Sequence, residues 1–75
     1  MPKLPVISGK AAARAFEKAG WEFSRIARNR HFVYTKPGCP AALSIPDHGV
    51  LDRGLLRSLI RDAGISVEDF VSLLE

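Results

Sequence analysis

Two runs of β-forming residues on either side of the short turn Arg28-Asn29-Arg30 constrain the fold of this chain most. Residues 21–27 are rich in aromatic and branched side chains and lack Pro and Gly, so they predict a strand. Residues 31–36, His-Phe-Val-Tyr-Thr-Lys, predict a second strand. Asn29 is the turn residue that best tolerates a positive φ angle. We therefore expect an antiparallel hairpin with two arginines directly before His31.

Helical patterns precede and follow this hairpin. Ser8 can cap a helix over residues 9–19, and its apolar stripe consists mostly of alanine, which predicts a close approach to a sheet. Asp52 can cap a second helix over residues 53–63, and Ser66 can cap a short closing helix. The expected core face of the second helix consists of Leu55, Leu56, Leu59, Ile60 and Ala63.

A third strand completes the predicted sheet. Residues 37–40, Pro-Gly-Cys-Pro, predict a turn, and residues 41–45 predict a short third strand. Pro46 either ends this strand or places it at an edge of the sheet. The order α-β-β-β-α, with an extra short C-terminal helix, indicates an α+β two-layer sandwich with the helices on one face of a three-stranded antiparallel sheet. We expect residues 1–75 to form a single domain, because the chain is too short for two.

Composition bears on the cellular location of this domain and on the charge of its partners. A single cysteine allows no internal disulfide, and the N-terminal residues lack a long apolar run, so we expect a cytoplasmic protein that neither enters nor spans a membrane. Residues 1–36 hold eight Lys or Arg against two acidic residues, whereas residues 37–75 hold three against six. This asymmetry favours contact between the first half and a polyanion, although a merely solubilising surface has the same pattern.

The chain contains few groups for catalysis. It has no glycine-rich nucleotide loop and no Cys/His cluster with zinc spacing, so we expect neither a cofactor nor a metal. Cys39 lies in the predicted Pro-Gly turn and is more readily a tolerated loop residue than a nucleophile. His31 and His48 remain. RNA carries its own nucleophile, the 2′-hydroxyl, so its cleavage requires only proton transfer and charge stabilisation.

His31, next to Arg28 and Arg30, fits that requirement, although a histidine at the start of a strand is more often a surface or packing residue. For a second proton-transfer group His48, Tyr34 and Lys36 all stay open, and His48 is more readily a loop-ordering residue. The candidate RNA-binding cations are Lys10, Arg14, Lys18, Arg28, Arg30 and Lys36. The first three form a helical stripe that either tracks a phosphate backbone or is simply solvated.

Several stretches of the chain together resemble the HicA (YcfA-like) toxins of HicAB toxin–antitoxin modules. The matching stretches are Leu4-Pro5-Val6-Ile7-Ser8-Gly9-Lys10, Lys18-Ala19-Gly20-Trp21-Glu22, Ile45-Pro46-Asp47-His48-Gly49 and residues 54–66. The last, Gly-Leu-Leu-Arg-Ser-Leu-Ile-Arg-Asp-Ala-Gly-Ile-Ser, is the most specific. His31 stands where that family has the histidine of its Gly-Ser-His turn, but Asn29-Arg30 replaces the Gly-Ser.

The resemblance implies a fold like that of double-stranded-RNA-binding domains and an mRNA interferase that cuts RNA without a metal. It implies that His31 is the catalytic residue. It also implies a HicB-like antitoxin as partner, with operator DNA contacted only indirectly through the toxin–antitoxin complex. The residues themselves leave two other functions open, a non-catalytic RNA-binding module that uses the helical basic stripe and a small subunit whose basic half docks an acidic protein.

Overall fold

The computed structural model describes residues 4–74, and within that range it consists of three α-helices, one short 3-10 turn and a three-stranded antiparallel sheet. The elements follow one another as α1 (Gly9–Lys18), β1 (Glu22–Ala27), the 3-10 turn η1 (Arg28–Arg30), β2 (His31–Lys36), β3 (Cys39–Pro46), α2 (Arg53–Ala63) and α3 (Val67–Leu73). The strand order in the sheet is β1-β2-β3. The predicted α+β class and the α-β-β-β-α order with an extra C-terminal helix are confirmed.

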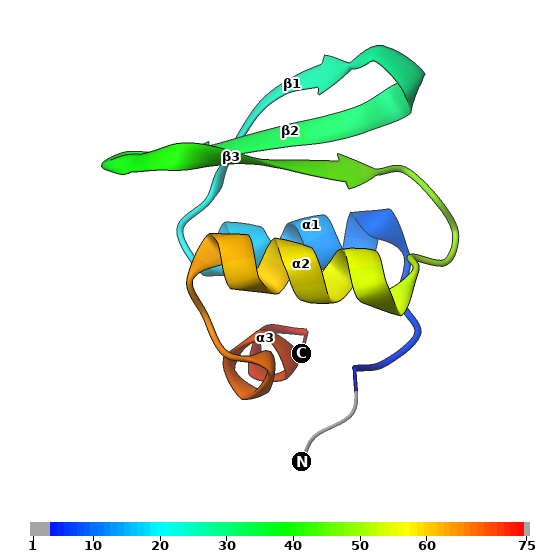
Figure 1. The fold of residues 1–75 in the computed structure, drawn as a ribbon. Helices are drawn as coiled ribbons and strands as arrows, with labels where there is room; N and C mark the ends of the chain where they lie inside the picture. Colours follow the sequence, from blue (N-terminus) through cyan, green and yellow to red (C-terminus); the bar gives the residue numbers. More distant parts are fainter. Residues whose placement is uncertain (1–3, 75) are drawn as a thin grey trace.

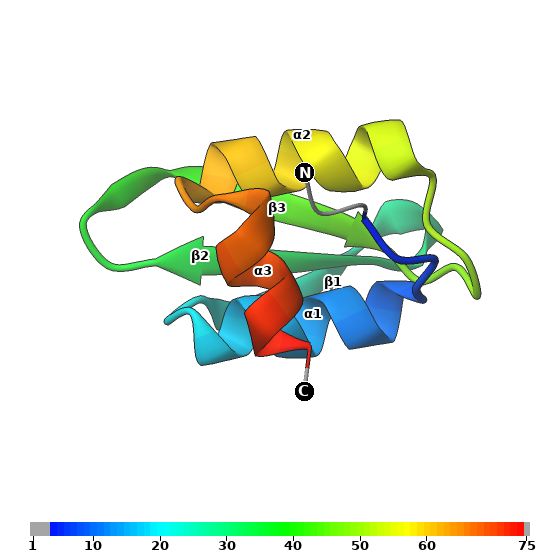
Figure 2. The ribbon, with the colours of Figure 1, turned by 90° about the horizontal axis from the view of Figure 1, so that it is seen from below.

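The elements form a sheet layer and a helical layer, with one further helix packed beneath. Both α1 and α2 lie on the same face of the sheet, and α3 packs under the two helices on the side away from the strands (Figures 1 and 2). The helices contact the sheet mainly through β3, while β1 lies farthest from them (Figure 1). One face of the sheet is therefore covered by helices over β2 and β3, and the other face is open.

The first helix packs closely because its inner face is small. Ser8 caps α1, and its Oγ accepts a hydrogen bond from the backbone N–H of Ala11 at 3.1 Å. The buried residues of this helix are Gly9, Ala12, Ala13, Ala15 and Phe16. At the first turn the backbone of α1 touches the end of β3, where a Cβ atom on Gly9 would lie 2.0 Å from the carbonyl oxygen of Pro46. The expected close approach of helix and sheet is thus confirmed.

The last two helices close the core. Asp52 caps α2 through a hydrogen bond from the Leu55 N–H, and Gly64 ends it in the left-handed conformation. Phe70 of α3 is fully buried, and its ring centroid lies 5.0 Å from that of Phe16. The predicted core face of α2 is confirmed for Leu56, Leu59 and Ile60, which are buried, and is wrong at Leu55, which is 36% exposed.

The third strand is longer than the sequence predicts. It begins at Cys39 rather than residue 41, and it includes Pro46. Only Pro37 and Gly38 remain in the turn, and Gly38 has a φ of +81°, which lets the chain reverse over two residues. Cys39 is therefore a strand residue that packs partly against the core and pairs with Lys36, not a loop residue.

Candidate functional site

The turn between β1 and β2 determines how His31 is presented. Two consecutive residues have positive φ angles, Asn29 at +64° and Arg30 at +60°. The left-handed conformation expected for Asn29 is confirmed. Arg30 was not expected to adopt it, and a non-glycine residue there is less stable by roughly 1 kcal/mol than in the right-handed region. The turn exposes both of its arginines to solvent directly before the histidine.

His31 begins β2 and lies on the open face of the sheet. It pairs with Ala27 on one side and with Pro46 on the other. Its neighbours in the strand, Phe32 and Tyr34, pack towards the helices, so alternation places His31 on the opposite face. The face of the sheet without helices therefore carries the His31 side chain. That side chain is half-buried, because its strand β2 lies between β1 and β3.

A hydrogen bond orients the imidazole of His31. Its Nδ1 lies 3.0 Å from Oγ of Ser44, which sits on the same open face in β3. If Nδ1 carries the proton, it donates to the hydroxyl and Nε2 is left as a base. If the hydroxyl donates to Nδ1, Nε2 carries the proton and is an acid. In both tautomers the serine occupies Nδ1, so Nε2 is the nitrogen available for proton transfer to a bound molecule.

A bulge in β1 brings a further cation to this face. The register pairs Phe23 with Tyr34 but Arg25 with Val33, so the chain gains one residue at Ser24. Phe23 consequently faces the helices, whereas Arg25 shares the open face with His31. The sequence did not predict that Arg25 lies beside His31, because in a regular strand Arg25 would point to the same face as Phe23. One signal in the sequence could have indicated the bulge: the apolar residues Phe23 and Ile26 are three positions apart, and a regular strand would place them on opposite faces.

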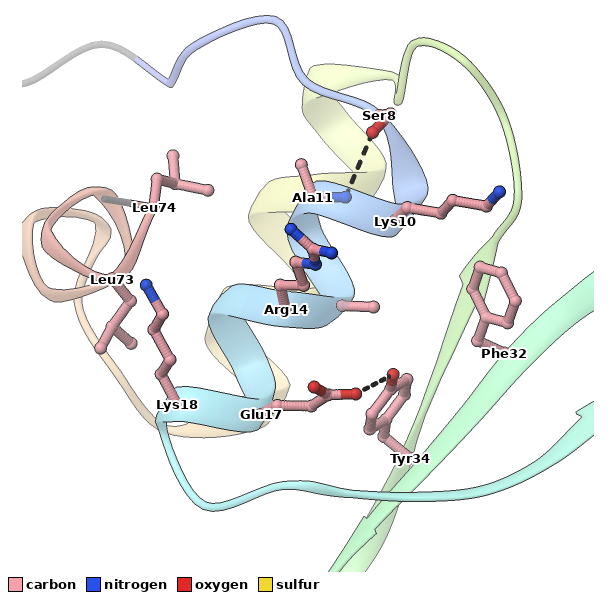
Figure 3. A pocket seen from close by; sticks show the side chains of 11 residues that line it. Ser8, Lys10, Ala11, Arg14, Glu17, Lys18, Phe32, Tyr34, Leu73 and Leu74 are labelled. Atoms are coloured by element: carbon pink, nitrogen blue, oxygen red, sulfur yellow. Dashed lines mark hydrogen bonds between the residues drawn. The ribbon is translucent and has the colours of Figure 1, made fainter.

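The sequence-predicted cations divide between two sides of the molecule. Arg28 and Arg30 lie in the turn beside His31. Lys10, Arg14 and Lys18 lie on α1, which packs on the other face of the sheet (Figures 1 and 3). Lys36 also faces the helices, and its Nζ donates to the carbonyl oxygen of Ala19 at 3.2 Å. The structure therefore places Arg28 and Arg30, but not the other four predicted cations, near the histidine.

Tyr34 and His48 are not placed as partners of His31 either. The Tyr34 hydroxyl faces α1 and donates to Oε2 of Glu17 at 2.6 Å (Figure 3). Burial and this carboxylate raise the pKa of Tyr34 from 10.0 to about 12. His48 is exposed in the loop after β3, where its backbone carbonyl accepts a hydrogen bond from the Gly9 N–H at 2.9 Å. That contact orders the loop through the backbone and leaves the imidazole in solvent.

Within residues 4–74 no three His, Cys, Asp or Glu side chains are grouped so that they could hold a metal ion. The same part of the chain has no helix that is long and apolar enough to cross a membrane.

Comparison with protein families gives one result. The model of the HicA toxin of bacterial toxin–antitoxin systems matches residues 9–65. The chain belongs to the HicA toxin family. The matched range runs from the first residue of α1 to just beyond α2 and includes the 28–30 turn and His31, whereas α3 lies outside it. Membership makes this protein a toxin of a toxin–antitoxin module and implies a cognate antitoxin as partner. No curated protein matches the chain significantly.

Proposed function

We propose that this toxin is an endoribonuclease that cleaves mRNA without a metal ion, and that His31 transfers a proton in the reaction. The observation that carries the proposal is the oriented imidazole on the open face of the sheet, with Nδ1 held by Ser44 and Nε2 free for substrate. Family membership supports the toxin role. A HicB-like antitoxin binds and neutralises the toxin until the toxin is released from the complex.

The reaction uses the nucleophile that RNA itself contains. The 2′-oxygen attacks the adjacent phosphorus, and the bond from phosphorus to the 5′-oxygen breaks. One proton leaves the 2′-hydroxyl and another reaches the departing 5′-oxygen. His31 Nε2 performs one of these transfers, as a base when unprotonated and as an acid when protonated. The products are a 2′,3′-cyclic phosphate and a 5′-hydroxyl.

The positive charge around His31 has a defined part in this mechanism. Negative charge accumulates on the phosphoryl oxygens as the 2′-oxygen attacks, and fixed cations near that position stabilise it. Arg28 and Arg30 in the turn and Arg25 on the open face are the cations closest to His31 by topology. Guanidinium groups also bind phosphate through two donors at once, which favours these residues as the substrate-binding set.

A comparison of two histidine variants tests the proposal. His31→Ala is expected to lose growth inhibition and to cleave RNA at least about 100-fold more slowly, which is the usual contribution of a general acid or base. His48→Ala is the matched control, because its imidazole is exposed and its role in the loop is carried by its backbone. It is expected to retain activity. Cleavage by His31→Ala at the original rate would reject the assignment.

The same experiment separates cleavage from binding alone. A non-catalytic RNA-binding module would bind RNA in a salt-dependent way, yield no products and respond equally to both substitutions. The structure offers one feature for such binding, the basic stripe on α1, but that stripe lies across the sheet from His31.

A further inference from the structure

The helix-facing side of β1 carries an exposed apolar surface. Phe23 is 51% exposed and Ile26 is 60% exposed, although both belong to the face that elsewhere packs against helices. They are cross-strand neighbours of Tyr34 and Phe32, respectively. The helices pack mainly on β3, so no element among residues 4–74 covers this part of the sheet (Figure 1). Exposed apolar side chains that are adjacent on one surface are typical of an interaction site.

A groove runs beside these residues. It has a volume of about 660 Å³, and α1 and β2 form its walls at this end, where Phe32 and Tyr34 provide apolar surface (Figure 3). Through the β1–β2 register, Ile26 and Phe23 extend that surface outward to the edge of the sheet. The lining of the groove includes no β1 residue, so the apolar strip consists of Phe32 and Tyr34 inside the groove and their cross-strand neighbours Ile26 and Phe23 outside it. We call the groove and this strip together the α1–β1 groove.

The α1 side of this groove is basic. Lys10 and Arg14 line it, and both are exposed. Lys10 extends towards Phe32, and Arg14 projects from the middle of the helix (Figure 3). The acidic side chain in the groove wall, Glu17, accepts the hydrogen bond of Tyr34. Positive charge therefore borders the apolar strip, and an occupant that combines apolar groups with carboxylates is complementary to it.

We propose that the α1–β1 groove binds an amphipathic, acidic segment of the antitoxin, on the face of the sheet opposite His31. Apolar side chains of that segment cover Ile26 and Phe23, and its carboxylates pair with Lys10 and Arg14. The identity of the partner rests on the toxin–antitoxin role proposed above, whereas the chemistry of the segment follows from the groove itself.

The groove suits a protein segment better than RNA. RNA bases stack on exposed flat aromatic faces. Here the Tyr34 ring is buried, and it contacts the exposed ring of Phe23 in a T-shaped arrangement with centroids 5.7 Å apart and planes at 73°, so of these two rings only Phe23 is open to a base. Ile26 adds aliphatic surface, which offers nothing to a base but packs well against Leu, Val or Ile of a protein. The open face with His31 is the surface left to RNA.

Antitoxin binding to charge-reversal variants tests the proposal. The probe is the purified antitoxin, titrated into the full-length toxin. Ile26→Glu and the double variant Lys10→Glu/Arg14→Glu are expected to weaken binding by roughly tenfold or more, as losses at the centre of an interface do. The double variant also loses part of the salt dependence. Val50→Glu is the matched control, because it also replaces an exposed apolar side chain by a carboxylate, in the loop before α2 and outside the groove, and it is expected to change the affinity less than about twofold.

The outcomes separate this site from the proposed function. Equal antitoxin affinity for wild type and both groove variants would overturn the groove site and leave the ribonuclease assignment intact. Weaker RNA binding by Ile26→Glu, with antitoxin binding unchanged, would show RNA as the occupant and also overturn it. Absence of antitoxin binding by the wild type rejects the partner and the site together. RNA cleavage by Ile26→Glu is expected to be unchanged.

Discussion

The contact between Gly9 and the end of β3 predicts a large loss of stability for Gly9→Ala. The new Cβ would lie 2.0 Å from the carbonyl oxygen of Pro46 and 3.1 Å from its carbonyl carbon. Both are backbone atoms of a strand that pairs with His31, so they cannot rotate away as a side chain does. The first turn of α1 must therefore move off the sheet, which also breaks the hydrogen bond from the Gly9 N–H to the His48 carbonyl.

The magnitude follows from these two losses. Inserting a methyl group into a packed site costs about 1–3 kcal/mol, and the hydrogen bond contributes about 1 kcal/mol. Alanine is a better helix former than glycine by at most about 1 kcal/mol. Together these terms lower the free energy of unfolding by about 1–4 kcal/mol, a large part of the roughly 4–11 kcal/mol that a chain of this length has in total. At about 4–8 °C for each kcal/mol in a domain of this size, the melting temperature drops by about 5 °C or more.

Urea denaturation measures this change, with Gly49→Ala as the matched control. A Cβ at Gly49 meets no atom within 4 Å, and its φ lies outside the left-handed region. The control is therefore expected to be neutral or more stable by a few tenths of a kcal/mol, about the entropic gain of removing a glycine. A Gly9→Ala variant as stable as Gly49→Ala would refute the close packing of α1 against Pro46.

Three further predictions concern the site and its surroundings. Ser44→Ala removes the hydrogen-bond partner of His31 Nδ1, so nitrogen NMR is expected to show a changed population of the two imidazole tautomers. RNA cleavage is expected to slow by roughly fivefold, which corresponds to the free energy of one hydrogen bond. An unchanged imidazole spectrum would exclude a positioning role for Ser44. Arg30→Gly places glycine, which tolerates a positive φ, at a backbone φ of +60°, so the melting temperature is expected to rise slightly. The same change removes a cation proposed to bind phosphate, so the affinity for RNA is expected to fall. A lower melting temperature would contradict backbone strain at Arg30. Burial and the Glu17 carboxylate raise the pKa of Tyr34 to about 12 in the folded protein, above its ordinary 10.0, so the wild type loses stability relative to Tyr34→Phe as the pH rises from 10 to 12. If the two proteins instead lose stability in parallel across that range, the raised pKa of Tyr34 is wrong.

Local sequence signals predicted most of the fold. The caps Ser8, Asp52 and Ser66 start helices where expected, and Asn29 adopts the predicted left-handed turn conformation. These features depend on residues close together in the chain, so propensity and capping chemistry suffice. The start of β3 was missed, because residues 37–40 have the composition of a turn, whereas Pro40 lies in an edge strand, where proline is tolerated. Pro46 lies in the same edge strand, which is one of the two placements that the sequence allowed.

The surroundings of His31 were less accessible to sequence reasoning. The bulge at Ser24 moves Arg25 to the open face, and only strand register reveals it. Ser44 becomes the partner of His31 through the pairing of β2 with β3, thirteen residues away in the chain. The packing of α1 on one face of the sheet also separates its cations from those of the 28–30 turn. A sequence shows which residues are basic, but the face that each one shares is set by tertiary pairing.

If His31 promotes attack by the 2′-hydroxyl of RNA, the chemistry of the cleaved ends reveals it. The toxin is incubated with a defined RNA in EDTA, alongside the same RNA carrying a single 2′-deoxy sugar at the cleavage site. We expect 2′,3′-cyclic phosphate and 5′-hydroxyl ends, no cut at the 2′-deoxy position, and neither product with His31→Ala. Products with 5′-phosphate and 3′-hydroxyl ends, or cleavage that EDTA abolishes, would contradict it.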